Sequence, residues 1–139
     1  MRDSKAKLER EAEKVIKKEF VIWLTTVDSG QAPQPRPVWF IWDNDTFLIF
    51  SRSKAYKIQH IKQNDSVSLH FNCDDRASAN VIIYIGKAVL DGNSPPSHKV
   101  PAYLRKYGKA IKEMGMTPEE FSDEFSVAIR IKPTSLRGW

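Results

Sequence analysis

Basic and hydroxyl side chains gather where a strand-like segment gives way to a helical one. The apolar run "TFLIFS" is typical of a β-strand, and Ile58 and Ile61 further on have helical spacing. Between them lie Ser51, Arg52, Ser53, Lys54 and Lys57. A helix N-terminus has unpaired N–H groups and partial positive charge, so it attracts anions. The sequence therefore predicts an anion site at this junction.

Arg36 is expected to join the same site. The segments "PRPVWFIW" and "TFLIFS" should pair through a tight turn at Asp43 to Asp45, which brings Arg36 toward the junction. The predicted phosphate site then consists of Arg36, Ser51, Arg52, Ser53 and Lys57. The alternative is that Ser53 only caps the helix, since serine is strongly favoured there, and that the lysines are solvated surface. The segment has neither a P-loop nor a dinucleotide-binding glycine pattern.

The apolar segments predict six strands, over residues 20–27, 33–42, 46–51, 66–71, 80–90 and 125–131. Prolines at every second position place the second strand at an edge, or leave alternate N–H groups unpaired. Helices are expected over about 4–19, 53–63 and 101–114, and Thr117 with Glu120 forms a capping box for another. We expect an α+β fold in one domain, residues 1–139: a six-stranded antiparallel, closed or nearly closed barrel with flanking helices.

The amino-acid composition limits the classes of partner that the protein is expected to bind. The 22 basic and 17 acidic residues give a net charge of +5, which favours an anionic ligand. The charges of residues 4–19 alternate in sign, however, and the aromatic residues lie among apolar ones, so no nucleic-acid partner is expected. The longest apolar runs are strand-sized, which predicts no membrane partner. The single cysteine, Cys73, has no intrachain partner, which suits a cytoplasmic location.

The remaining residues that could do chemistry give weaker signals. His60, His70 and His98 lack metal-ligand spacing and Cys73 has no neighbouring ligand, so no metal site is expected. His70 alternates with Leu69 and Phe71, and it is either a buried, hydrogen-bonded residue or a catalytic one. A terminal tryptophan is costly to leave in water, so we expect Trp139 to be buried.

The order of the predicted segments resembles that of a known protein family. The stretch from "WLTTVDSG" to "SVSLHF" is similar to the split-barrel flavin-binding superfamily of pyridoxamine 5'-phosphate oxidase-like proteins. The block "GMTPEEF" followed by "FSVAIRIKPTSLRG" is most similar to the branch of deazaflavin (coenzyme F-420)-dependent oxidoreductases. The chain lacks the Arg-Leu-x-Pro ending typical of the vitamin B6 oxidases, and Ser53 stands where that branch often has proline.

The resemblance implies a homodimer with two cofactor sites at the subunit interface. It implies an oxidoreductase that transfers hydride to or from a small organic substrate, with coenzyme F-420 preferred and FMN as the alternative. A non-catalytic flavin or heme carrier is the other alternative, and the catalytic residues and substrate stay open. The implied cofactor contacts are the phosphate on Ser51, Ser53 and Lys57, the ring along Arg36, Pro37 and Val38, and a groove lined by Phe50 and Arg52.

Overall fold

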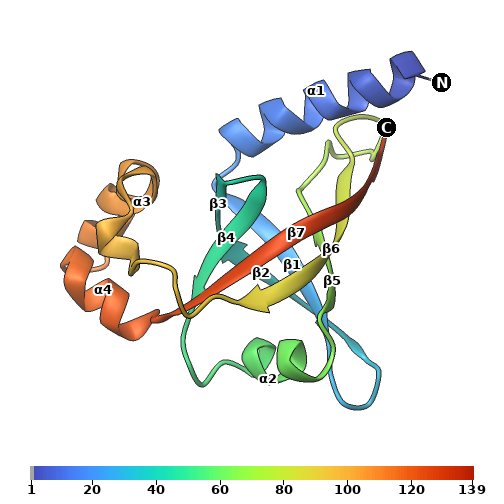
Figure 1. The fold of residues 1–139 in the computed structure, drawn as a ribbon. Helices are drawn as coiled ribbons and strands as arrows, with labels where there is room; N and C mark the ends of the chain where they lie inside the picture. Colours follow the sequence, from blue (N-terminus) through green and yellow to red (C-terminus); the bar gives the residue numbers. More distant parts are fainter. Residues whose placement is uncertain (1) are drawn as a thin grey trace.

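The computed structural model describes residues 2–139, with side chains from Ser4 onward. It is an α+β protein, as predicted, in which one antiparallel sheet curls into a half-barrel (Figure 1). The strands are β1 (Val21–Val27), β2 (Pro33–Trp39), β3 (Ile41–Asp43), β4 (Thr46–Ser51), β5 (Ser66–His70), β6 (Ile82–Leu90) and β7 (Val127–Gly138). Their order in the sheet is β2-β1-β5-β6-β7-β4-β3.

The two edge strands of this sheet are joined in the chain by one residue. Strands β2 and β3 lie at opposite edges of the sheet, yet only Phe40 separates them in the chain. The chain therefore steps from one edge to the other and closes the barrel through Phe40, which is fully buried. The prediction of one continuous strand over 33–42 is wrong for this reason, and the sheet has seven strands instead of six.

Strand β2 is an edge strand, as its prolines predicted. All seven of its residues are in register with β1, and because proline has no N–H, only Gln34, Arg36, Val38 and Trp39 can donate a backbone hydrogen bond. Pro33, Pro35 and Pro37 therefore face the open edge. An edge with proline at three alternate positions pairs poorly with another strand, so β2 stays available for other contacts.

Helices cover the ends and one side of the barrel (Figure 1). Helix α1 (Arg2–Lys18) packs Ala12 against the main core, and α2 (Tyr56–Gln63) inserts Ile58 and Ile61. Helix α2 begins at Tyr56, three residues later than the helix predicted over 53–63, and its N-cap is Ala55, so the alternative in which Ser53 caps the helix is wrong. A second apolar cluster forms around η1 (Ser97–Lys99), α3 (Pro101–Glu113) and α4 (Pro118–Glu124).

Two local predictions are confirmed and one is corrected. Thr117 and Glu120 form the expected capping box of α4, and the β3–β4 turn is tight, with φ of 51° and 58° at Asn44 and Asp45. Trp139 was expected to be buried but is 64% exposed. Its Nε1 donates to the carbonyl of Ala77 at 2.7 Å, which holds the ring at the surface. No helix within residues 2–139 is long and apolar enough to span a membrane.

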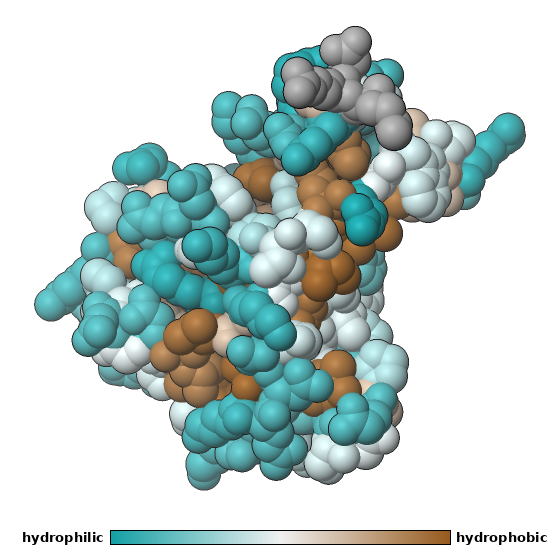
Figure 2. Space-filling view, turned by 45° about the vertical axis from the view of Figure 1, so that its right-hand side comes forward, coloured by the Kyte–Doolittle hydropathy of each residue, from teal (hydrophilic) through white to brown (hydrophobic). Residues whose placement is uncertain are grey.

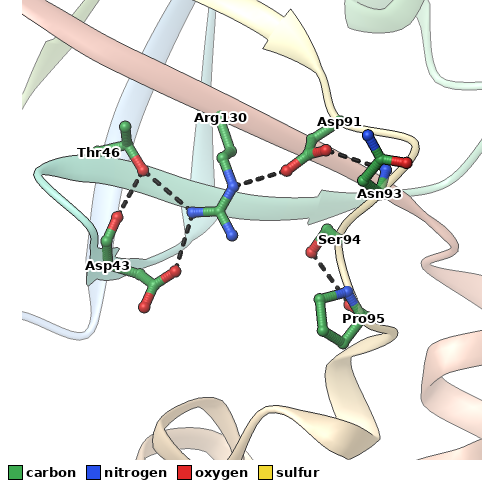
Figure 3. A network of polar contacts seen from close by, with 7 residues as sticks. All are labelled: Asp43, Thr46, Asp91, Asn93, Ser94, Pro95 and Arg130. Carbon is green, nitrogen blue, oxygen red and sulfur yellow. Dashed lines mark hydrogen bonds and ion pairs between the residues drawn. The ribbon is translucent and has the colours of Figure 1, made fainter.

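Arg130 ties the β3–β4 hairpin to the rest of the sheet (Figure 3). From β7 it donates through Nε to Asp91 at 2.8 Å and through Nη1 to Asp43 at 2.9 Å and Thr46 at 3.1 Å. The hydrogen bond from Arg130 is the largest cause that holds the pKa of Asp91 below its usual range. Two carboxylates therefore depend on one guanidinium, whose side chain is 22% exposed.

We expect Arg130→Met to lower the free energy of unfolding by about 2 kcal/mol, since it leaves two carboxylates without their charged partner. Urea unfolding at pH 7 measures the loss, and Arg137→Met, on an exposed residue of the same strand, is the control. The pKa of Asp91 is lower in the folded state, so the stabilisation is lost on acidification below about pH 4. The difference between wild type and Arg130→Met should narrow there, and a constant difference would contradict this assignment.

Candidate functional site

A groove of about 470 Å³ lies between the ends of β2 and β4 and the helices α3 and α4. Its volume is within the roughly 300–1,000 Å³ typical of small-molecule sites. The lining includes six of the eight residues predicted from the sequence: Pro37, Val38, Phe50, Ser51, Arg52 and Lys57. The hairpin pairing that was used to bring Arg36 close is replaced by barrel closure, because β2 pairs with β1 and β4 pairs with β3 and β7.

Three cations gather at one end of this groove. Burial is the main cause that lowers the pKa of Lys57, and the charges of Arg36 and Arg52 lower it further. The three positive charges therefore act on one another although they come from α2, β2 and the end of β4. None of the ion pairs among residues 4–139 includes Lys57. The groove thus presents a half-buried ammonium group that lacks a protein carboxylate.

The two arginines have protein partners in the ligand-free molecule. Arg52 donates to Glu124 at 2.8 Å and lies over the ring of Phe125, with 4.8 Å from Cζ to the centroid. Arg36 donates to the carbonyl of Pro35 at 2.7 Å. Both are exposed, so an incoming anion can compete for them at small cost.

The two serines differ in position. Ser51 lines the groove, is only 2% exposed, and donates its hydroxyl to the carbonyl of Arg52 at 3.0 Å. Ser53 is exposed and lies outside the lining, in the turn before α2. Ala55 lines the groove directly before α2, whose first N–H groups have no intrahelical acceptor. The structure therefore brings Ser51 into the site and leaves Ser53 at its margin.

Sequence reasoning missed the aromatic wall of the groove, which begins at Phe125 beneath Arg52. Trp39 stacks on Phe121 with centroids 5.5 Å apart, and Phe121 stacks on Phe125 at 4.4 Å. Tyr103 and Met114 complete this wall. The helical spacing of Tyr103 identified a helix, but nothing in the sequence indicated that α3 and α4 fold back over the end of β2.

Other candidate features lie outside the groove. His70 stacks on Trp23 on the outer face of the sheet, where burial lowers its pKa. A wider cleft lies beneath α1 and includes Leu8, Tyr84 and Trp139. Its charged residues have both signs, with Lys5, Lys7 and Lys17 beside Glu9, Glu11 and Glu13. In the groove Arg52 pairs with Glu124, but Lys57 has no carboxylate partner among residues 4–139, so the groove is the better anion site.

Replacing Lys57 should stabilise the ligand-free protein. Its ammonium group is desolvated beside two like charges, and a lowered lysine pKa in the folded state costs stability at every pH below that pKa. We expect Lys57→Met to raise the free energy of unfolding at pH 7 by about 0.5–1 kcal/mol. Urea unfolding measures the change, with Lys54→Met, an exposed neighbour, as control. A loss of stability would show that Lys57 has a structural role.

Comparison with solved structures supports the fold. A protein from Listeria innocua, described as a candidate pyridoxamine 5'-phosphate oxidase, is 24% identical with a TM-score of 0.69, over 94% of this chain and 97% of that one. An F420 reductase is 21% identical with a TM-score of 0.63, over 90% and 94%. The heme storage protein HutZ from Vibrio cholerae is 15% identical with a TM-score of 0.62, over 94% of both chains.

The sequence itself identifies the family. No curated protein matches the chain. Residues 8–139, however, match the pyridoxamine 5'-phosphate oxidase family, which is nearly the whole chain. The groove, the curled antiparallel sheet and this match agree with the resemblance found in the sequence. The protein therefore belongs to the pyridoxamine 5'-phosphate oxidase family, which includes oxidoreductases and has a flavin-binding split-barrel fold.

Proposed function

We propose that the protein is an oxidoreductase that binds a phosphorylated flavin-type cofactor in this groove and transfers hydride to or from a small organic substrate. Coenzyme F-420 is the preferred cofactor and FMN is the alternative. The observation that carries the proposal is Lys57, a half-buried ammonium group beside Arg36 and Arg52 without a carboxylate of its own. A desolvated, unpaired charge lowers the stability of the folded protein, and natural proteins keep such destabilising groups mainly at functional sites.

The residues of the groove fit such a cofactor at both ends. A phosphate would be held by Lys57, by the backbone N–H groups at the start of α2, and by the two arginines. The flat ring system would lie toward Pro37, Val38 and the aromatic wall, whose apolar surface keeps water away from it. When bound, the cofactor supplies the hydride chemistry, while the chain binds, orients and shields it.

The choice of coenzyme F-420 depends on charge and on the C-terminal block. This cofactor carries a phosphodiester and a glutamate tail, so it extends negative charge beyond a single phosphate. Arg36, Arg52 and Lys54 are exposed near the cationic end and could follow such a tail. The F420 reductase among the similar structures agrees with this choice.

A heme carrier is the alternative that the heme storage protein raises. Heme iron is usually held by His, Cys, Met or Tyr. Of these, the described lining of the groove offers only Met114 and Tyr103. Burial raises the pKa of Tyr103 far above its ordinary value, which disfavours the phenolate that would bind iron. The groove therefore suits a phosphorylated flavin better than heme.

The proposed enzyme is a homodimer. On the outer face of the sheet Trp23, His70 and Ile83 lie side by side on β1, β5 and β6, and Ile85 is 42% exposed next to them. Large apolar side chains also reach the surface as separate patches elsewhere (Figure 2). A second copy that covers this outer face would bury these side chains.

The cofactor is tested by titrating the protein with FMN, F-420 and riboflavin while following tryptophan fluorescence. We expect F-420 to bind, and to weaken more with rising salt than FMN does, because its exposed tail is screened. Tight FMN binding without F-420 binding at low salt would assign the cofactor to FMN. Binding of neither would overturn the proposed function.

Lys57→Ala should weaken FMN binding by about 1.5–3 kcal/mol, the range for a hydrogen bond to a charged group. Riboflavin, which lacks the phosphate, should bind the variant as it binds wild type. Lys62→Ala, on the last turn of the same helix, removes the same charge and serves as the control. Equal losses for FMN and riboflavin would place the phosphate elsewhere.

Ile85→Asp should convert the dimer to a monomer, because it buries a carboxylate at the proposed contact. Sedimentation velocity at micromolar concentration measures the state of assembly. Gln59→Asp, on an exposed residue of α2 away from this face, is the control and should stay dimeric. A monomeric wild-type protein would remove the dimer from the proposal without affecting the groove.

A further inference from the structure

The backbone of Phe40 leaves the sheet ladder and is held by helix α3. Its N–H donates to the hydroxyl of Tyr107 at 2.8 Å, and its carbonyl accepts from Nζ of Lys106 at 2.9 Å. The same hydroxyl lies 2.8 Å from the carbonyl of Phe20, the residue directly before β1. One phenol therefore joins the start of β1 to the step between β2 and β3.

The hydrogen bonds around this hydroxyl can be assigned by counting protons. Tyr107 has one proton to donate and two carbonyls within 2.8 Å, those of Phe20 and Phe40. Lys106 already donates to the carbonyl of Phe40, so the hydroxyl of Tyr107 donates its proton to the carbonyl of Phe20. Both carbonyls and the N–H of Phe40 then have a hydrogen-bond partner. The side chain of Tyr107 is fully buried, so water cannot replace any of these bonds.

The same residue supports the groove from behind. The ring of Tyr107 stacks on Trp39 with centroids 4.5 Å apart and 6° between the planes. Trp39 lines the groove together with Pro37 and Val38, the residues along which the cofactor ring is expected. Tyr107 itself is not part of the lining. It contacts the β2 side of the groove through its ring and the next backbone unit through its hydroxyl.

We propose that Tyr107 is a positioning residue that fixes the β2 side of the groove for the ring of the cofactor. The inference rests on the proposed function for the identity of the ligand. The hydroxyl of Tyr107 holds the backbone of Phe40, which directly follows Pro37, Val38 and Trp39 in the chain. Arg52 and Lys57, the two cations that line the groove, come from the end of β4 and from α2, so their position should be independent of this hydroxyl, whereas Arg36 on β2 lies outside the lining.

The test is Tyr107→Phe, which keeps the stacked ring and removes the hydroxyl. Tyr84→Phe is the matched control, because Tyr84 is also buried but packs against Phe47 in the other apolar cluster. We expect Tyr107→Phe to weaken riboflavin and FMN by a similar factor, about tenfold, as misplaced binding groups do. Binding of inorganic pyrophosphate, which probes the cationic end alone, should not change.

The outcomes separate positioning from a general loss of structure. Wild-type riboflavin affinity in Tyr107→Phe would overturn the inference, and so would an equal loss of pyrophosphate binding. If that variant does not fold, Lys106→Met is measured with riboflavin, a neutral ligand. In Lys106→Met the hydroxyl of Tyr107 has one proton for the carbonyls of both Phe20 and Phe40. We therefore expect the affinity for riboflavin to fall about threefold. Unchanged affinity would contradict the proposal.

A readout without ligand keeps this inference distinct from the proposed function. If the wild-type protein binds no flavin, the proposed function fails. Amide hydrogen exchange of the free protein then tests whether the hydroxyl of Tyr107 holds the backbone of Phe40. The N–H of Phe40 should exchange faster in Tyr107→Phe than in Tyr84→Phe, because its acceptor is gone. Equal exchange in the two variants would overturn the positioning role.

Discussion

The closure of the barrel at Phe40 is the constraint on which the rest of this structure depends. A sheet of seven strands has two edges, and here the chain joins them through a single residue. That residue cannot pair its backbone within the ladder, so α3 supplies a phenol and an ammonium group as partners. Helix α3 is thereby fixed against the end of β2, and the space left between them is the groove.

The groove combines two environments that serve different parts of one ligand. Its aromatic wall depends on the packing of α3 and α4, which the capping box of Thr117 and Glu120 helps to set. Its cationic end combines α2, the end of β4 and Arg36 of β2, and there burial and the two arginines disfavour the charge of Lys57. Only an anion with an apolar flat part uses both ends, and phosphorylated flavins and deazaflavins have this form.

Much of this could be predicted from the sequence because local patterns specify local structure. The alternation of apolar residues located the strands, the prolines placed β2 at an edge, and the basic residues after β4 include two that line the groove, Arg52 and Lys57. Lys57 stood out because it lies three residues after Lys54, at the start of the predicted helix. These features depend on residues close together in the chain.

What could not be predicted depends on contacts between distant segments. The break at Phe40 comes from Tyr107, 67 positions away, and no local signal in "PVWFIW" reveals it. The exposed Trp139 is held by backbone bonds to Val81 and by a side-chain bond to Ala77, in a loop 62 positions earlier. The aromatic wall needs Trp39, Phe121 and Phe125 together, and their stacking exists only once α3 and α4 have packed.

The central claim is that this groove, and no other part of the molecule, binds the phosphorylated cofactor. Amide NMR spectra of the labelled protein, recorded during titration with F-420 and with FMN, test it most directly. The account predicts that shifts concentrate on Val38, Trp39, Arg52 and the first turn of α2, while Leu8 and Tyr84 beneath α1 keep their positions. Shifts centred on the cleft beneath α1, with those of Arg52 and Lys57 unmoved, would contradict it.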